Sequence, residues 1–262
     1  MSAAPGIFDA QDSEELIRII TQEVIAHLDA RGAFAAAPAP PAEVAALIDH
    51  TLLKPDAIRA DIERICHEAA VYRFATVCVN PWYVPQAERL LRGSGVKVCT
   101  VVGFPLGATF PKVKLAEADQ SITLGAREID MVLNVGAFKS SEDDLVEAEI
   151  RLLAELCHPA GAICKVILET ALLSQEEKVR AALIAKKAGA DFVKTSTGFS
   201  AGGATVEDVA LLRKTLGTEM GIKASGGVRT LSELQALLAA GATRIGTSSG
   251  VKIMQELSGN AG

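Results

Sequence analysis

The chain has 262 residues, of which 49% are hydrophobic and only 4% aromatic. This composition supports a large aliphatic core, in one barrel-type domain or in two smaller domains. The formal net charge of -6 argues against non-specific nucleic-acid binding and against a basic membrane-surface protein. The five cysteines show no CxxC spacing, so we interpret them as free thiols in a reducing compartment.

The N-terminal residues contain neither the basic segment nor the apolar segment of a signal peptide. No apolar run reaches the roughly 18 residues that a transmembrane helix needs. We therefore expect a cytoplasmic protein without a membrane partner.

The N-terminal region differs in composition from the rest. In "DSEELIRIITQEVIAHLDARG", aliphatic residues recur every four positions from Leu16 to Leu28, which predicts an amphipathic helix within residues 12–30. The following "AFAAAPAPPAE" is an Ala/Pro linker that would pack poorly. We predict a helix and linker over residues 1–41 and a separate domain over residues 42–262.

Short apolar segments alternate with amphipathic ones through this second domain. Helical stretches such as "KVKLAEADQSITLGA" and "EEKVRAALIAKKAGA" end in Gly-Ala, as a helix C-cap would. Eight strand-like segments separate them, near Leu47, Val77, Val98, Met131, Val166, Val193, Lys223 and Gly246. The pattern predicts an α/β fold, a (β/α)₈ TIM barrel. A doubly wound open sheet is the main alternative, but no Gly-rich fingerprint follows the first strand.

Five charged side chains lie in or beside the predicted strands. We expect Asp49 to end the first strand, while Asp130, Lys165, Lys194 and Lys223 lie in the fourth to seventh. Side chains at the C-terminal ends of barrel strands face the active site, so we expect all five in one cleft. A single strand lysine often reaches solvent instead. Three on consecutive strands, with two carboxylates, favour a catalytic cluster.

Such a cluster has the composition of a Schiff-base enzyme. A neutral lysine amine attacks carbonyl groups, and a second ammonium nearby together with desolvation favours the neutral form. We expect Lys194 and Lys223 to form such a pair, in which one becomes the imine and the other stays charged. Asp130 could move a proton directly or through water. This is the equipment of a metal-free class I aldolase.

Metal chemistry has little support in the sequence. The four histidines show no pair at metal-ligand spacing. His50, directly after Asp49, is the only one expected near the cleft. We therefore expect no metal.

Two small-residue loops follow the last two predicted strands. Loops at this position of a TIM barrel often bind phosphate through backbone N–H groups. Each loop alone could be an ordinary turn, but together they favour a phosphate site. The residues assigned to it are Gly226, Gly227 and Arg229 of "GGVRT", Ser248 and Ser249 of "GTSSG", and Gly198 of "KTSTG".

These segments resemble the deoxyribose-phosphate aldolase family. The matching stretches occur in order over roughly residues 44–250 and are "IDHTLLKP", "ATVCVNPWYV", "VVGFPLGA", "EIDMVLNVGA", "KVILET", "ADFVKTSTGFSAGGAT", "IKASGGVRT" and "IGTSSG". The resemblance implies a (β/α)₈ barrel that reversibly cleaves 2-deoxy-D-ribose 5-phosphate into acetaldehyde and D-glyceraldehyde 3-phosphate without a cofactor.

The resemblance also implies roles. Lys194 of "KTSTG" would form the Schiff base, Lys223 would tune it and relay protons, and Asp130 would donate and accept protons. Lys165 and Asp49 resemble supporting residues of the same cleft. Some family members carry a lysine directly after "TSTG" and a C-terminal tyrosine, whereas this chain has Phe199 and ends in "SGNAG".

Two other functions remain open from the residues alone. One is a transaldolase-like or isomerase activity on another phosphosugar, and an isomerase would need a carboxylate base but no reactive lysine. The other is a non-enzymatic barrel that binds phosphosugars, which gives no reason for adjacent strand lysines. In each case the partner is a small phosphosugar, and a homo-oligomer is possible.

The N-terminal helix has two interpretations. It could be an extra helix packed on the barrel or at a subunit interface. Its short Ile/Leu/Val stripe followed by an Ala/Pro linker also resembles the encapsulation peptides of enzymes in bacterial microcompartments. That resemblance implies a shell protein as a partner of residues 12–30.

Overall fold

The structure, a computed structural model, describes residue 22 and residues 41–259. The helix and linker predicted for residues 1–41 lie outside these residues, apart from positions 22 and 41. Among the described residues, no helix has the length and apolar character that crossing a bilayer requires.

The strands form one closed barrel in which each strand runs parallel to the next and β8 pairs with β1. This confirms the predicted (β/α)₈ TIM barrel, and the open-sheet alternative is wrong. The strands are β1 (Ile48–Leu52), β2 (Thr76–Val79), β3 (Lys97–Val102), β4 (Glu128–Val132), β5 (Ile163–Ile167), β6 (Phe192–Lys194), β7 (Gly221–Ser225) and β8 (Arg244–Thr247).

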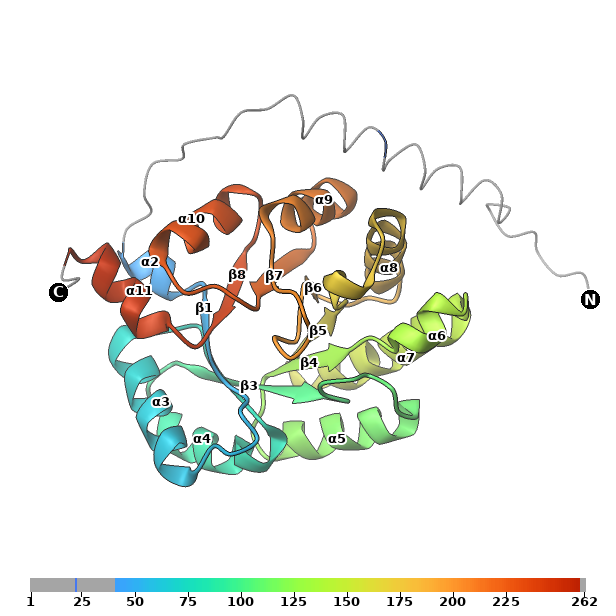
Figure 1. The fold of residues 1–262 in the computed structure, drawn as a ribbon. Helices are drawn as coiled ribbons and strands as arrows, with labels where there is room; N and C mark the ends of the chain where they lie inside the picture. The colour runs from blue at the N-terminus through green and yellow to red at the C-terminus, as the bar shows by residue number, and fades with distance from the viewer. Residues whose placement is uncertain (1–21, 23–40, 260–262) are drawn as a thin grey trace, which may run out of the picture.

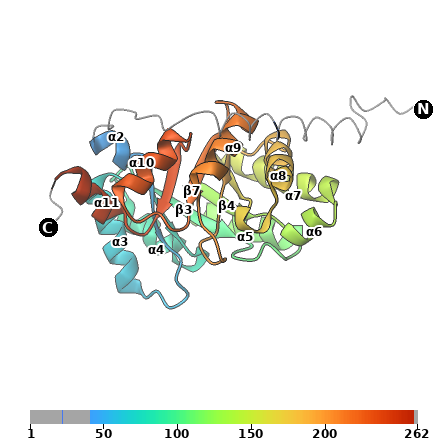
Figure 2. The ribbon, with the colours of Figure 1, turned by 45° about the horizontal axis from the view of Figure 1, so that its top comes forward.

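Helices surround the barrel, and the short α2 packs beside α11 (Figures 1 and 2). The main helices are α2 (Pro41–Ala45), α3 (Arg59–Tyr72), α4 (Val84–Leu91), α5 (Pro111–Thr123), α6 (Val135–Lys139), α7 (Asp143–Cys157), α8 (Gln175–Lys187), α9 (Val206–Leu216), α10 (Leu231–Ala239) and α11 (Gly250–Leu257). Single 3₁₀ turns are η1 (Pro81–Tyr83), η2 (His158–Ala160) and η3 (Thr170–Leu172).

Local sequence explains where several helices begin. Ser174 caps α8 and Thr230 caps α10, and in each case a glutamate three residues later completes a capping box. Acidic residues in the first turn of α8 and lysines in its last turn also suit the helix dipole. The helices therefore start directly after the loops at the C-terminal end of the barrel.

Strand side chains alternate between two environments, as the period of two requires. On β5, Cys164 and Val166 join the large apolar core between barrel and helices, while Lys165 points inward to other interior charges. On β7, Ile222 faces the same core and Lys223 faces the interior. The apolar core thus lies outside the strands, and the interior is free to carry polar groups.

The barrel interior has an apolar side and a charged side. Leu53, Cys78, Cys99 and Val101 form a small apolar cluster on the side of β2 and β3. Charged residues occupy the opposite side, on β1 and on β4 to β8. Buried charges are costly unless they are paired, so this side marks the functional site.

One predicted strand position is wrong. Asp49 does not end β1 but is its second residue, because the strand runs from Ile48 to Leu52. The apolar residues before it belong to α2 and to a turn. Asp49 therefore lies deep in the barrel and not at its mouth.

Candidate active site

The carboxylate of Asp130 lies at the centre of the charged side. Its Oδ2 accepts hydrogen bonds from Nζ of Lys194 at 2.9 Å and of Lys223 at 2.6 Å. Its Oδ1 accepts a third from Nζ of Lys165 at 2.7 Å. None of the four residues is more than 2% exposed. Three basic side chains therefore share one buried carboxylate.

The strand register explains this convergence. Lys194 is the last residue of β6 and pairs with Lys223 of β7, so their side chains leave adjacent strands at the same height. Asp130 pairs with Lys165, which itself pairs with Phe192 at the start of β6. Lys165 thus enters the cluster from a deeper level. The structure brings together all five side chains that the sequence analysis placed in one cleft, with Asp49 contacting Lys223 and Lys165.

A second layer of ion pairs lies nearer the N-terminal ends of the strands. Nη1 of Arg244 lies 2.7 Å from Oδ1 of Asp49 and 3.0 Å from Oε2 of Glu128. Lys165 bridges the two layers, with Nζ 2.6 Å from the same Glu128 oxygen. Nζ of Lys223 lies 2.5 Å from Oδ2 of Asp49. Asp49 therefore joins the cluster from below, where it holds Lys223.

The sequence analysis missed Glu128 and Arg244. Glu128 stands two residues before Asp130 on β4, so the strand period already gave it the same inward direction. Arg244 offered no such signal, because an arginine at the start of a strand commonly reaches solvent. Only closure of β8 onto β1 places it over the carboxylate of Asp49.

Burial and charge act in opposite directions on these groups. Burial alone would raise the pKa of Asp130, but the lysines, Lys165 first, hold its pKa well below the usual value. Burial alone would lower the pKa of Lys223, but Asp130 and Asp49 raise its pKa above the usual value. The pKa of Lys165 is raised in the same way. At neutral pH, Asp130 is therefore ionised, and Lys223 and Lys165 are charged.

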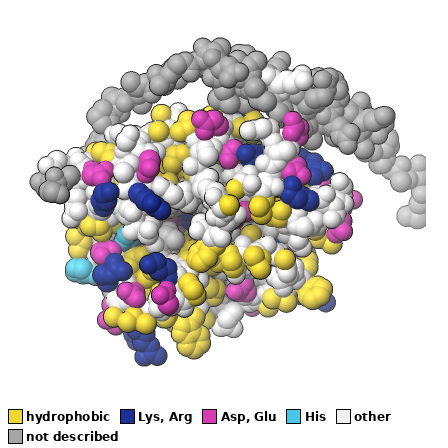
Figure 3. Space-filling view, viewed as in Figure 1, with side chains coloured by type: hydrophobic (Ala, Val, Ile, Leu, Met, Phe, Trp, Pro, Cys, Tyr) yellow, Lys and Arg dark blue, Asp and Glu magenta, His cyan; other side chains and the backbone are white. Residues whose placement is uncertain are grey.

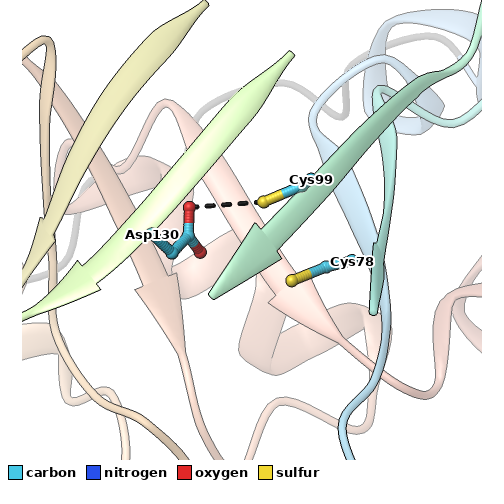
Figure 4. Close-up of side chains that lie close together, drawn as sticks. All are labelled: Cys78, Cys99 and Asp130. Atoms are coloured by element: carbon cyan, nitrogen blue, oxygen red, sulfur yellow. Dashed lines mark hydrogen bonds between the residues drawn. The ribbon is translucent and has the colours of Figure 1, made fainter. Parts of the chain in front are cut away.

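Two thiols border the cluster on its apolar side (Figure 4). Cys99 donates a hydrogen bond to Oδ1 of Asp130 at 3.3 Å, and burial raises the pKa of the Cys99 thiol. One ligand atom each of Cys78, Cys99 and Asp130 lie within 4.8 Å of one another, a spacing that could suit a metal ion. The lysine side chains around Asp130 oppose a divalent cation there. The absence of a catalytic metal stays a prediction.

Three loops at the C-terminal end of the barrel carry the predicted phosphate residues. A Cβ at Gly226 would lie 3.7 Å from Cα of Gly198, so the loops after β6 and β7 touch. The hydroxyl of Thr247 donates to O of Val228 at 2.7 Å and accepts from N of Ser249 at 2.9 Å, which joins the loops after β7 and β8. The six assigned residues therefore belong to adjoining loops.

The backbone of these loops offers donors. Gly226 and Gly227 both have positive φ, 88° and 84°, a conformation that glycine adopts without strain. Within residues 41–259, neither their N–H groups nor that of Ser248 has a hydrogen-bond acceptor. Ser249 precedes the first turn of α11. The arrangement suits an anion.

Two other residues named in the sequence analysis, Arg229 and His50, lie outside the buried charged cluster. Arg229 is exposed, and its backbone N–H donates to Glu233 of α10 at 2.7 Å, so this residue lies at the rim of the barrel. His50 does not face the cleft as expected. Its Nε2 lies 2.7 Å from a carboxylate oxygen of Glu68 on α3, and its ring packs on Phe74, because even-numbered residues of β1 point outward.

Comparisons with known proteins agree with this geometry. The family model of the DeoC/LacD family aldolases matches residues 43–256. A deoxyribose-phosphate aldolase of Geobacillus sp. is 57% identical over 218 residues, 83% of this chain and 97% of that protein. One from Streptococcus sanguinis is 58% identical over 215 residues, covering 81% and 97%. The tetrameric deoxyribose phosphate aldolase structure from Aeropyrum pernix superposes with a TM-score of 0.79 at 35% identity, covering 92% and 97%.

Proposed function

The chain belongs to the DeoC/LacD aldolase family, and we propose that it reversibly cleaves 2-deoxy-D-ribose 5-phosphate to acetaldehyde and D-glyceraldehyde 3-phosphate. The reaction is of the class I type, through a Schiff base on Lys194. One observation carries the assignment of residues. Lys194 and Lys223, in register on adjacent strands, bond to the same oxygen of Asp130.

Lys194 is the best placed of the three lysines to attack a substrate. It ends β6 at the C-terminal side of the barrel and has one carboxylate contact, at 2.9 Å. Lys165 contacts three carboxylates and Lys223 contacts two, which hold both as ammonium ions. Attack by the neutral amine of Lys194 on C1 of the open-chain sugar gives a carbinolamine, and loss of water gives the imine.

Cleavage then needs proton transfers beside the imine. The C3 hydroxyl loses its proton, the C2–C3 bond breaks, and its electron pair moves into the imine to leave an enamine on Lys194. D-Glyceraldehyde 3-phosphate departs as the first product. Protonation of the enamine carbon regenerates an imine, which water hydrolyses to acetaldehyde and the free lysine. Asp130, through one oxygen shared with Lys223, is placed to exchange these protons directly or through water.

The deeper charges support this cluster and do not touch the substrate. Lys165 neutralises the second oxygen of Asp130, and Asp49 holds Lys223 from below. Arg244 in turn neutralises Asp49. This chain of pairs keeps the catalytic carboxylate ionised and fixed in place.

The phosphate group binds at the three loops beyond the cluster. The N–H groups of Gly226, Gly227 and Ser248, which have no acceptor within residues 41–259, support this placement. Ser249 at the start of α11 and the turn at Gly198 support it too. Arg229 at the rim adds positive charge. Some relatives carry a lysine where this chain has Phe199, whose ring centroid lies 5.2 Å from that of Phe104. Because that lysine is replaced, the backbone N–H groups provide most of the phosphate binding.

Turnover of the phosphorylated sugar tests the function. Purified protein with 2-deoxy-D-ribose 5-phosphate should release acetaldehyde, which alcohol dehydrogenase and NADH detect by loss of absorbance. Lys194→Met, a substitution of similar length without the amine, is the control and should release none. Absence of acetaldehyde with the unchanged protein would reject the function, and turnover by the Lys194→Met variant would reject the site.

The protein also forms a homo-oligomer in this proposal. Trp82, Leu106 and Phe110 are 75–80% exposed, and apolar side chains gather on the lower part of the face in Figure 3, between the places of α4 and α5 in Figure 1. Exposed apolar patches mark interaction surfaces. Light scattering should give a mass above 27.4 kDa, and Phe110→Glu should lower it, while Leu152→Glu on α7 should not.

The N-terminal region is proposed to be a helix within residues 12–30 and a linker to residue 41, before a barrel over residues 42–262. The helix binds a microcompartment shell protein in the cytoplasm, where enclosure would retain volatile acetaldehyde. Residues 1–41 fused to a fluorescent protein should form puncta when shell proteins are co-expressed, and Leu16→Glu with Ile20→Glu should disperse them. A diffuse signal, or a barrel that unfolds without residues 1–41, would favour packing on the barrel.

A further inference from the structure

A buried glutamate beside the cluster has no role in the mechanism above. Glu169 lies two residues after the end of β5, and its side chain is only 4% exposed. Its backbone has φ 55° and ψ 63°, the left-handed conformation that glycine or asparagine adopts more readily. A charged residue in a buried, strained position implies a specific contact that compensates for both costs.

That contact is with the turn after Lys194. Oε2 of Glu169 accepts hydrogen bonds from N of Thr197, at 3.2 Å, and from the Thr197 hydroxyl. The same hydroxyl accepts a hydrogen bond from N of Phe199 at 3.1 Å. A relay of three groups thus runs from the carboxylate through Thr197 to Phe199, and it encloses Gly198, whose φ is 83°.

The relay decides which backbone donor of the turn is available. The N–H groups of Thr197 and Phe199 are both used. Within the part of the chain that the structure describes, the N–H of Gly198 between them has no acceptor. Gly198 also lies against Gly226 of the proposed phosphate site. The relay therefore leaves one donor free, next to the loop where the phosphate group would bind.

Lys194 is held by different contacts. Its carbonyl accepts from N of Leu168 at 2.8 Å, and N of Thr195 donates to O of Lys223 at 3.0 Å. The Thr195 hydroxyl donates to O and accepts from N of Ser225, both at 3.1 Å. The Ser225 hydroxyl also donates to O of Ser196 at 2.8 Å, so the barrel strands fix the chain up to Ser196. The backbone of the turn beyond it is held through Glu169 and Thr197, while the Phe199 ring packs on Phe104.

We infer that Glu169 is a positioning residue that fixes the 197–199 turn and so sets the reach from the Lys194 imine to the phosphate end of the substrate. The inference rests on the proposed aldol cleavage. A carboxylate would repel a phosphate directly, so its buried place behind the turn indicates that it acts through Thr197. Its second oxygen, Oε1, is buried without a partner in the described residues, so the side chain is committed to the turn through Oε2 alone.

Four single variants and one double variant test the inference. Glu169→Ala removes the acceptor, and Glu169→Gln keeps an oxygen at the same place without the charge. Thr197→Val removes the hydroxyl relay with little change in volume. Glu176→Ala is the matched control, because it removes an exposed carboxylate from the first turn of α8, the helix that follows Glu169 along the chain.

The expected result is a split between two substrates. Glu169→Ala and Thr197→Val should each raise KM for 2-deoxy-D-ribose 5-phosphate about tenfold, as loss of one hydrogen-bonded contact does. KM for unphosphorylated deoxyribose and the rate of borohydride trapping with acetaldehyde should change less than about threefold, because Lys194 is held separately. Glu169→Gln should show only a small part of this increase in KM, because it keeps the accepting oxygen. The double variant Glu169→Ala/Thr197→Val should raise KM no more than either single variant does, because both substitutions break the same relay.

Other results would overturn the inference. Unchanged KM in Thr197→Val, equal losses for both sugars, or loss of acetaldehyde trapping would each contradict a role at the phosphate end. If Glu169→Ala does not fold, Thr197→Val and Glu169→Gln decide the question. Failure of the proposed function is distinguishable, because the unchanged protein would then release no acetaldehyde from the phosphorylated sugar.

Discussion

Replacement of Lys223 by leucine separates proton transfer from imine formation. Nζ of Lys223 lies 2.5 Å from Asp49 and 2.6 Å from Asp130, and the side chain is fully buried. Breaking a buried ion pair costs about 3–5 kcal/mol. We expect the lower end of this range, because Asp130 keeps two lysines and Asp49 keeps Arg244. Domains of this kind unfold with about 5–15 kcal/mol, so the fold should survive.

Activity should fall far more than stability. Loss of a positioned proton-transfer group typically costs 10²–10⁴-fold, so kcat for 2-deoxy-D-ribose 5-phosphate at pH 7 should fall by about that factor. The imine forms on Lys194, and the neighbouring ammonium of Lys223 favours the neutral amine that attacks. Without Lys223, trapping with acetaldehyde and borohydride should be weak at pH 7 and increase as the pH rises.

Lys178→Leu is the matched control. Lys178 forms an ion pair with Asp208 at 2.6 Å and is 9% exposed, but it joins α8 to α9 away from the cluster. Urea unfolding should show a comparable loss of stability in both variants, with activity kept in Lys178→Leu. Lys223→Leu with more than a tenth of the original kcat, or with the trapping profile of the unchanged protein, would refute the reasoning.

Three further outcomes are expected. Ser249→Asp should raise KM for the phosphorylated sugar through charge repulsion and change KM for deoxyribose far less; equal effects would count against the phosphate site. Full activity should survive EDTA, and a loss restored by a divalent ion would reject the metal-free mechanism. Burial would raise the pKa of Asp49, but the cations, Lys223 first, lower it below its ordinary 3.8. The ion pairs of Asp49 therefore stabilise the fold fully above about pH 4, and this contribution is lost as the pH falls. The free energy of unfolding in urea should decrease less between pH 4 and pH 2 in Asp49→Asn than in the unchanged protein. An equal decrease in both proteins would contradict the assigned ion pairs.

The barrel and the upper cluster could be predicted because they follow from local patterns. Each strand is a short apolar run between amphipathic helices, and a charged residue within such a run is unusual enough to notice. Lys194 and Lys223 stand at equivalent points of consecutive runs, so parallel pairing brings them together. Motif order along the chain then indicated the family, which the comparisons confirm.

The lower layer could not be predicted, because it depends on where strands begin and how the barrel closes. The limits of β1 were misjudged by a few residues, which moved Asp49 from the floor of the site to its mouth. Arg244 meets Glu128 from the far side of the barrel, 116 positions along the chain. No local pattern carries such a contact.

Glu169 was missed for a different reason. In the sequence it is a polar residue after a strand, and nothing marks its left-handed backbone or its burial. Its importance arises only because the following strand returns Thr197 to its carboxylate. Contacts of this kind depend on tertiary structure, and no local sequence pattern indicates them.

Reductive trapping tests the Schiff-base assignment most directly. The protein is incubated with acetaldehyde or with 2-deoxy-D-ribose 5-phosphate, reduced with borohydride, digested and mapped by mass spectrometry. A single two-carbon adduct on Lys194 is the predicted result with acetaldehyde, and Lys194→Met should abolish it. An adduct on Lys165 or Lys223 in its place, or no adduct in a protein that turns over substrate, would contradict the assignment.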